Sequence, residues 1–211
     1  PAEQAPRMRN DFTRINFGWL NYILPGDNTI GTQPDILEFA TSRAAAWDCP
    51  ISLQSHLQRL AEHPRTIDNM EVLRRWEQIR TNNWLTVEQK EMLKNLYQEH
   101  HLLINEQGNY ELVPIEMIND VADNSREIRA SIFERKGKLH VLYSHISDEK
   151  ELQLNISPRR LTLFHKFGQS EAIKYVGDHV IIPVSSRKYL RFEDCSKNEI
   201  LEILKTATLV K

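Results

Sequence analysis

The sequence lacks the motifs that would assign a reaction directly. It has no Gly-rich phosphate loop, no GxSxG nucleophile elbow and no reactive cysteine with a nearby histidine signature. Its two cysteines, Cys49 and Cys195, stand far apart in no CxxC or Cys/His ligand spacing, so we expect neither a metal nor a cofactor. Two buried free thiols are the first interpretation. A disulfide between them is the alternative, which leaves the redox compartment open.

Charge and hydropathy argue against two classes of partner. The net charge of −2 gives no basic field, so nucleic acid is not expected as the main partner. No apolar run approaches the roughly 20 residues of a membrane span, so no membrane partner is expected. Apolar residues at 40% and charged residues at 27% are typical of a soluble protein. The chain begins with Pro1 and shows no signal segment, so we expect a processed chain or a piece of something longer.

The first third of the chain alternates between strand-like and helix-like patterns. Along the sequence these are a β-leaning run at Thr13–Trp19, a helix over Gln33–Trp47 capped by Thr32 with Asp35, a buried strand at Cys49–Leu53, and a helix over His56–His63 capped by Ser55. Such alternation predicts parallel strands joined by crossover helices. Two parallel strands do not make a stable sheet alone, so we favour the end of a larger α/β domain over strands supplied by another chain.

The rest of the chain changes from helical to two-residue periodicity. A helical stretch from Thr66 leads to a capping box at Thr86–Gln89, a helix over Val87–Leu96, and a hairpin formed by His101–Asn105 and Tyr110–Val113. The polar stretch Glu116–Ser125 is the predicted domain boundary. Beyond it, short strands with turn signals about every ten residues predict a β-sandwich, and Ser196 with Glu199 caps a last helix over Lys197–Thr206.

The stretch NFGWLNYILPGDNTIGTQPDILEFATSRAAAWDCPISL resembles the last two βα units of a (β/α)8 barrel. The segments MEVLRRWEQIR and EHHLLINEQGNYELVP, followed by a β-domain, are similar to the end of barrel glycoside hydrolases, in which a small antiparallel domain packs beside the barrel. This resemblance implies an α/β plus all-β fold: a partial barrel at residues 1–65, a helical and hairpin connection at 66–122, and a C-terminal antiparallel β-sandwich at 123–211. It also implies that the pair of catalytic carboxylates lies outside this chain.

The resemblance selects candidate substrate-binding residues, because barrel active sites lie in the loops after the strands. They are Trp19, Asn21 and Asp27 after the first strand, and Gln54 and His56 after the second. Trp19 suits stacking on a sugar ring, Asn21 and Gln54 suit hydroxyl recognition, and Asp27 and His56 suit hydrogen bonding or proton transfer. Structural alternatives stay open: a core or rim aromatic for Trp19, backbone satisfaction for Asn21, a turn position for Asp27 and an exposed first-turn position for His56.

Glu99, His100 and His101 form a group with metal-ligand chemistry. On a strand, adjacent side chains point to opposite faces, so the two imidazoles are not expected to converge on an ion. The Arg74-Arg75 and Arg159-Arg160 doublets are short and isolated, and we interpret them as solvated surface.

Two functional hypotheses follow. The first is the C-terminal part of a carbohydrate-active enzyme, with a carbohydrate substrate, the upstream half of the same protein as partner, and an extracytoplasmic location favoured by the resemblance. The second is a non-catalytic carbohydrate-binding or protein-interaction module that works through its β-domain. All four tryptophans precede that domain, which favours a supporting role for it. If the strands form an incomplete sheet, apolar surface should be exposed around Ile15, Phe17, Ile51 and Leu53.

Overall fold

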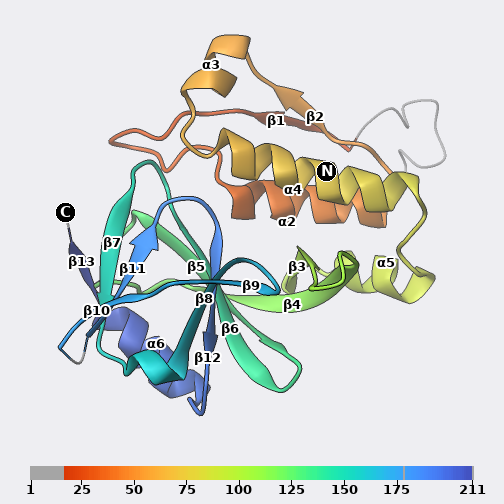
Figure 1. The fold of residues 1–211 in the computed structure, drawn as a ribbon. Coiled ribbons are helices and arrows are strands. Elements are labelled where there is room, and N and C mark those ends of the chain that lie inside the picture. Colours follow the sequence, from red (N-terminus) through yellow and green to blue (C-terminus); the bar gives the residue numbers. More distant parts are fainter. Residues whose placement is uncertain (1–16, 178, 211) are drawn as a thin grey trace. The chain divides into compact units, whose positions relative to one another are not determined.

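The computed structural model describes residues 17–177 and 179–210 and divides into two compact units, Pro1–His100 and His101–Lys211. The first combines helices with one pair of parallel strands, and the second is built from antiparallel sheets and one α-helix (Figure 1). This agrees with a mixed front part and a β-rich end. A barrel is not shown by the described residues, and the three-part division at 65 and 122 stays a prediction. None of the helices described is long and apolar enough to span a membrane.

The parallel arrangement expected for the front of the chain is confirmed. Strand β1 (Trp19–Asn21) pairs in parallel with β2 (Ser52–Gln54), and helix α2 (Pro34–Ala46) lies between them in the sequence. Both strands begin later than expected, and residues 13–16 of the first run lie outside the described residues. β2 is not buried on both faces: Ser52 and Leu53 are half-buried and Gln54 is exposed.

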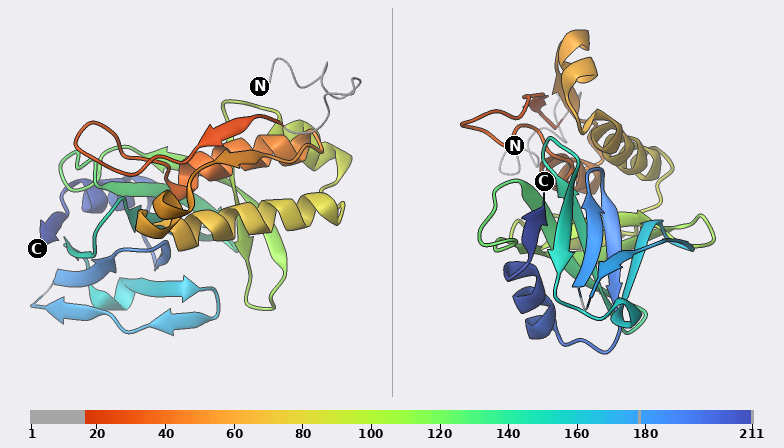
Figure 2. Two further views of the ribbon diagram at one scale, coloured as in Figure 1. Left: turned by 90° about the horizontal axis from the view of Figure 1, so that it is seen from above. Right: turned by 60° about the vertical axis from the view of Figure 1, so that its left-hand side comes forward.

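Three more helices follow in the first unit: α3 (Leu57–Glu62), α4 (Thr66–Thr81) and α5 (Val87–Leu93). Helices α2 and α4 run alongside each other, as both views of Figure 2 show. The apolar positions Val72, Trp76 and Ile79 of α4 recur at helical spacing and are buried. The indole Nε1 of Trp76 donates to Glu38 of α2 at 3.2 Å, so the buried carboxylate has a partner in the packed interface.

Two of the four predicted helix caps are correct. Thr86 and Gln89 form the complete capping box of α5, and Ser196 accepts from the Glu199 amide at the start of α6 (Lys197–Lys205). The caps predicted for Thr32 with Asp35 and for Ser55 are wrong, because α2 and α3 start from Gln33 and His56 without a side-chain cap. The Thr32 hydroxyl instead bonds the chain at the end of β1. Helix α5 also ends at Leu93, three residues earlier than predicted.

The second unit contains two antiparallel sheets that share one core. The larger has the strand order β3-β4-β5-β6-β12-β8-β9 and the smaller the order β10-β11-β7-β13. Their bounds are β3 (Glu99–Ile104), β4 (Tyr110–Ile118), β5 (Ile128–Arg135), β6 (Lys138–His145), β7 (Lys150–Leu154), β8 (Leu161–Lys166), β9 (Gln169–Glu171), β10 (Lys174–Val176), β11 (His179–Val184), β12 (Lys188–Phe192) and β13 (Thr208–Val210). Leu163 and Leu190 from the larger sheet and Leu154 and Val180 from the smaller are fully buried in the same cluster.

The predicted boundary at Glu116–Ser125 begins inside a strand. β4 continues to Ile118 and pairs with β5, Glu116 facing Ile132 and Ile118 facing Ala130. The β3–β4 hairpin therefore belongs to the larger sheet. Arg135 at the end of β5 fixes the turn of this hairpin. Its guanidinium donates to both carboxylate oxygens of Glu106, at 2.7 and 2.8 Å, and to the carboxylate of Glu111 at 2.7 Å.

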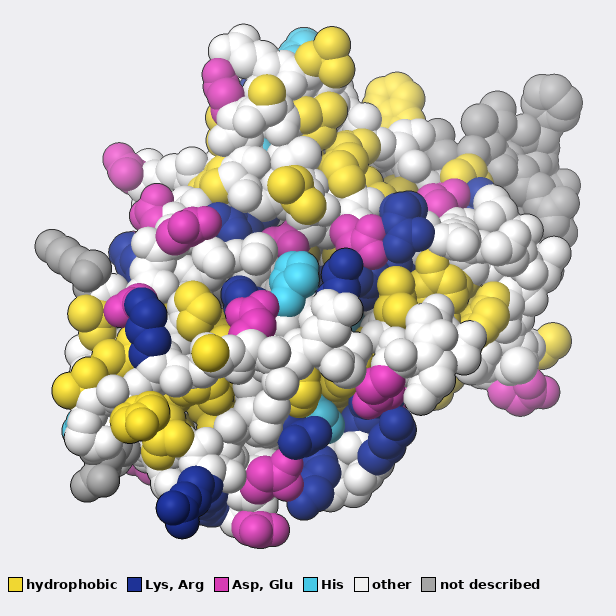
Figure 3. Space-filling model, in the orientation of Figure 1, with side chains coloured by type: hydrophobic (Ala, Val, Ile, Leu, Met, Phe, Trp, Pro, Cys, Tyr) yellow, Lys and Arg dark blue, Asp and Glu magenta, His cyan; other side chains and the backbone are white. Residues whose placement is uncertain are grey.

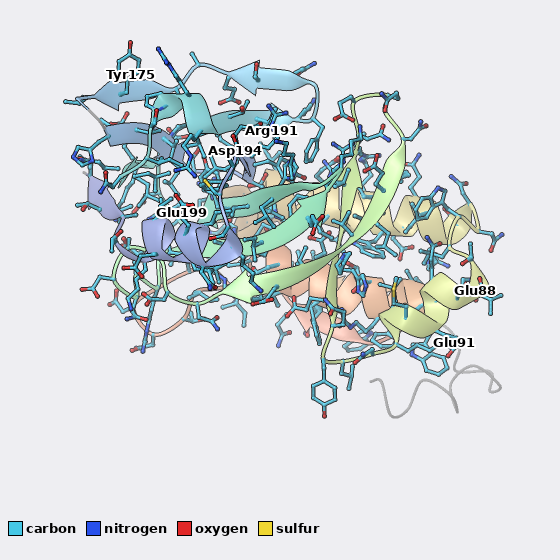
Figure 4. The ribbon with its side chains drawn as sticks, turned by 90° about the horizontal axis from the view of Figure 1, so that it is seen from below. Glu88, Glu91, Tyr175, Arg191, Asp194 and Glu199 are labelled. Atoms are coloured by element: carbon cyan, nitrogen blue, oxygen red, sulfur yellow. The ribbon has the colours of Figure 1, made fainter. Side chains whose placement is uncertain are left out.

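The last helix is tied to the sheets at its N-terminal end. Arg160, in a short 3-10 turn at Pro158–Arg160, donates to the Glu193 and Asp194 carbonyls and to the Glu199 carboxylate. Figure 4 labels Asp194 on the connection from β12 into α6 and Glu199 in the first turn of α6. Residues Ile200, Ile203 and Leu204 of α6 are buried and complete the shared core.

The hairpin makes the extent of the second unit testable. Residues 101–211 expressed alone should fold, whereas residues 126–211 should be less stable, because they lose β4 and the buried side chains Leu103, Val113 and Ile115. Chemical-shift dispersion and urea midpoints of the two fragments provide the measurement. Equal midpoints would show that the hairpin is not part of the unit.

Candidate functional site

The parallel strand pair presents four polar or aromatic side chains on one face, which we call the β1–β2 face. Register places Trp19 beside Ser52 and Asn21 beside Gln54, and alternate residues of a strand point the same way. Trp19 is 72% exposed, and Asn21 and Gln54 are also exposed. The opposite face carries Leu20 and Leu53, both half-buried. The structure therefore brings together three of the five predicted site residues.

The other two candidates lie in the segments that follow the strands. Asp27 occupies a turn closed by paired hydrogen bonds between Gly26 and Thr29 at 2.9 and 3.1 Å, so the predicted turn is present and its carboxylate is exposed. His56 is exposed at the N-cap position of α3. Neither residue belongs to the β1–β2 face, and the roles of all five residues in a site stay predictions.

The apolar surface expected around the strands differs from what we predicted. Phe17 is buried against Ala44 and Cys49, with Ile51 packed against this cluster, and Ile15 lies outside the described residues. Leu53 is half-buried, and the exposed large apolar side chains on and directly after β1 are Trp19 and Ile23, at 72% and 44% exposed. Hydrophobic side chains are also visible on the protruding α3 segment at the top of Figure 3, where Leu57 is 86% exposed.

A buried polar network holds the chain directly after β1. The Thr32 hydroxyl accepts from the Ile23 amide and donates to the Asn21 carbonyl, each at 2.9 Å. Asn69 of α4 donates to the Thr32 carbonyl at 2.8 Å and to the Tyr22 hydroxyl at 2.9 Å. All of these contacts converge on the end of β1, so they fix the backbone that carries Asn21.

Gly31, directly before Thr32, allows the chain to pass very close to the segment after β1. Gly31 has φ of 70°, and a Cβ atom there would lie 2.6 Å from the Ile23 carbonyl oxygen. Only glycine accommodates this left-handed conformation and this contact together. The segment after β1 is thereby drawn back against its own strand and delivers Thr32 to its partners.

The network also includes a buried histidine, His63. The His63 ring lies with its centroid 4.8 Å from that of Tyr22, and its Nδ1 accepts from the Arg65 amide at 3.0 Å. Burial, followed by the Arg65 charge, lowers the pKa of His63, and the Thr32 backbone offsets this in part. Sequence reasoning missed Tyr22, His63 and Asn69, since they belong to no motif and are far apart along the chain.

The two cysteines and the histidine pair form no site. Neither cysteine is in a disulfide; Cys49 is buried as predicted, and Cys195 is only half-buried. His100 and His101 lie on strand β3, and the His101 Nε2 is 2.8 Å from the Tyr189 hydroxyl. Among residues 17–177 and 179–210, no group of three or more His, Cys, Asp or Glu side chains gathers as metal ligands.

A second buried cluster lies in the second unit and is aromatic. His140 stacks on Phe133 with ring centroids 5.2 Å apart, contacts Phe167, and hydrogen-bonds the Lys138 carbonyl through Nδ1 at 3.1 Å. Burial above all lowers the pKa of His140 to about 4, with the Arg135 and Arg191 charges contributing in the same direction. These side chains pack against apolar neighbours, so we interpret the cluster as structural.

Removing the Thr32 hydroxyl should loosen the end of β1. Thr32→Val keeps the shape of the side chain but removes the hydrogen-bond partner of the Ile23 amide and of the Asn21 carbonyl. The free energy of unfolding should therefore fall by about 1–3 kcal/mol. Urea unfolding and hydrogen exchange at the Ile23 amide provide the measurement. Thr81→Val, at an exposed helix end, is the matched control and should change stability by less than about 0.5 kcal/mol. Similar effects of both changes would contradict the network.

His140 should make the protein less stable in acid. Its folded pKa of about 4 lies below the unfolded value near 6.5, so the unfolded chain takes up the proton first. The contribution of His140 is complete above pH 6.5 and is lost as pH falls towards 4, by about 3 kcal/mol. His140→Phe should show a correspondingly smaller loss between pH 7 and pH 4. An imidazole that titrates near 6.5 by NMR would contradict the burial argument.

Comparison with known proteins assigns no family. No family model and no curated protein matches the sequence. One similar solved structure is the crystal structure of an AmyP variant in complex with maltotriose, at 10% identity and a TM-score of 0.32, covering 84% of this chain. This chain spans 40% of the length of that structure. A likeness of this size does not establish a common fold.

Proposed function

We propose that this chain is the C-terminal part of a carbohydrate-active enzyme and that its β1–β2 face contributes to the sugar-binding wall. The observation that carries the proposal is the parallel pairing of β1 and β2, which sets exposed Trp19 beside the amide side chains of Asn21 and Gln54. Ligands of parallel α/β sheets bind at the carboxyl ends of the strands. Asn21 and Gln54 are the last residues of their strands.

The chemistry of the β1–β2 face suits a sugar. An aromatic ring offers a flat apolar surface for the C–H face of a pyranose, and amides both donate and accept hydrogen bonds, as sugar hydroxyls require. The network around Thr32 and Asn69 supports this interpretation, because it immobilises the backbone of Asn21 before any ligand arrives. Preorganisation of this kind reduces the ordering cost of binding.

The edges of the strand pair support a larger sheet. β1 bonds β2 through its even-numbered residues, with the Ser52 amide on the Gly18 carbonyl and the Tyr22 amide on the Gln54 carbonyl, each at 3.0 Å. The polar backbone of Trp19 and Leu53 is then directed to the outer edges. No third strand pairs with β1 or β2 in the described part of the chain. Parallel sheets are buried structures, so we propose that further strands complete this one.

The proposed enzyme would take its catalytic groups from those further strands. Glycoside hydrolysis uses two carboxylates about 5–9.5 Å apart. The segments after β1 and β2, residues 22–33 and 55–56, contain one acid, Asp27. Asp27 alone does not provide both partners, so this chain is assigned the binding role and not the bond-breaking one.

A specific observation supports the alternative of a binding module in the second unit. Tyr175 on edge strand β10 is 66% exposed, and Figure 4 shows its ring directed away from the ribbon. The other three tyrosines of this unit also lie in strands: Tyr143 and Tyr189 are buried, and Tyr110 is half-buried. One exposed ring makes a smaller platform than the β1–β2 face, so we rank this alternative second.

Aromatic substitution separates the two functions. The 211-residue chain should bind at least one of maltotriose, cellotriose and xylotriose in ligand-observed NMR, and Trp19→Ala should weaken that binding about tenfold, equivalent to about 1.4 kcal/mol of stacking and contact energy. Trp84→Ala, the same change at a partly exposed position, is the control and should leave binding unchanged. Loss of binding in Tyr175→Ala with Trp19→Ala unaffected would favour the module. Equal binding by all three variants would contradict both functions.

A further inference from the structure

The β1–β2 face carries no charge. Its four side chains, Trp19, Asn21, Ser52 and Gln54, are all neutral, and three of them are exposed. Residues two apart on a strand are separated by about 6.6 Å and neighbouring strands by about 4.8 Å. The four side chains therefore cover an area comparable with a single pyranose ring, one stacking group at one corner and hydrogen-bonding groups at the others.

The segments that border this face also lack a cation. Residues 22–33, which follow β1, contain Asp27 and no Lys or Arg, and residues 55–56, which follow β2, are Ser55 and His56. From Phe17 to Glu62 the chain has two arginines and no lysine. Within this stretch the permanent positive charges are Arg43 and Arg59, and the next arginine along the chain, Arg65, is buried at the N-cap of α4.

Neither arginine is placed as a ready anion receptor on the face. Arg43 is buried in α2, where its guanidinium donates to Ser42 and to the Asn95 and Gln98 carbonyls at 2.9–3.0 Å and lies over the Phe39 ring. Arg59 is exposed on α3, outside both strands. Proteins bind carboxylate and sulfate groups with guanidinium or ammonium donors, usually at bidentate geometry.

We infer that the β1–β2 face binds one neutral pyranose unit and discriminates against uronic acids and sulfated sugars. The inference rests on the proposed function and names the substrate class for the same site. A carboxylate on the ring would lose water without gaining a cation, and the exposed Asp27 in the following turn adds a like charge. A neutral ring exchanges its hydroxyl hydration for amide hydrogen bonds at Asn21 and Gln54.

Matched probes that differ only at the ring substituent test this inference. Methyl glucoside, galactoside and mannoside are titrated into the 211-residue chain beside their uronide counterparts, and the Trp19 indole and the Asn21 and Gln54 amide signals are followed by NMR. At least one neutral glycoside should shift these signals and bind at least fivefold more tightly than its uronide. Uronides that bind as tightly as the neutral sugars through Trp19 would overturn the inference and leave the proposed function standing.

A charge added to the face provides the complementary test. Gln54→Lys should raise the affinity for the uronide at least threefold, whereas Gln58→Lys, which adds the same charge on exposed α3, should not. Equal gains in the two variants would overturn the inference, as would uronide binding that disappears in Arg59→Ala. If neither class of sugar shifts the Trp19 signal, the proposed function fails and the inference falls with it.

Discussion

The parallel pairing of β1 with β2 is the constraint on which the rest of the first unit depends. Parallel strands cannot be joined by a tight turn, so the chain must leave Asn21, cross through α2 and return at Ser52. The two strands then end at the same edge, which is why Asn21 and Gln54, 33 positions apart in the sequence, become neighbours. A one-residue slip in this register would put the side chains of Trp19 and Asn21 on the face opposite to those of Ser52 and Gln54.

The buried network is the consequence of that crossover. After Tyr22 the chain leaves the sheet, and the backbone of Asn21 and Ile23 faces away from β2, so it needs hydrogen-bond partners outside the strand pair. Thr32 provides them, Asn69 holds Thr32, and Gly31 permits the close approach. Polar side chains buried in this way are stabilising only when they are satisfied, which ties the geometry of the candidate site to the packing of α4.

Sequence patterns predicted the elements that depend on local chemistry and missed those that depend on tertiary contacts. The Thr86 and Ser196 caps, the parallel relation of the first strands and the two-residue period of the second unit follow from spacing alone. Thr32 has the residue type of a cap, but its hydroxyl is taken by the backbone of Ile23 and Asn21, 9 and 11 residues earlier at the end of β1, which cap spacing does not reveal. The stretch predicted as a boundary, Glu116–Ser125, overlaps the end of β4, because strand pairing with β5 continues to Ile118 in spite of the low apolar content there.

The two units differ in how many large apolar side chains they expose. Eleven of the thirteen exposed large hydrophobic side chains in the described residues belong to the first unit, so that unit is the one whose apolar surface is incompletely covered. The second unit closes its main core between two sheets and α6, and its exposed pair, Tyr175 and Val176, lies on one short edge strand. Within the described residues, the second unit therefore covers its large apolar side chains more completely than the first.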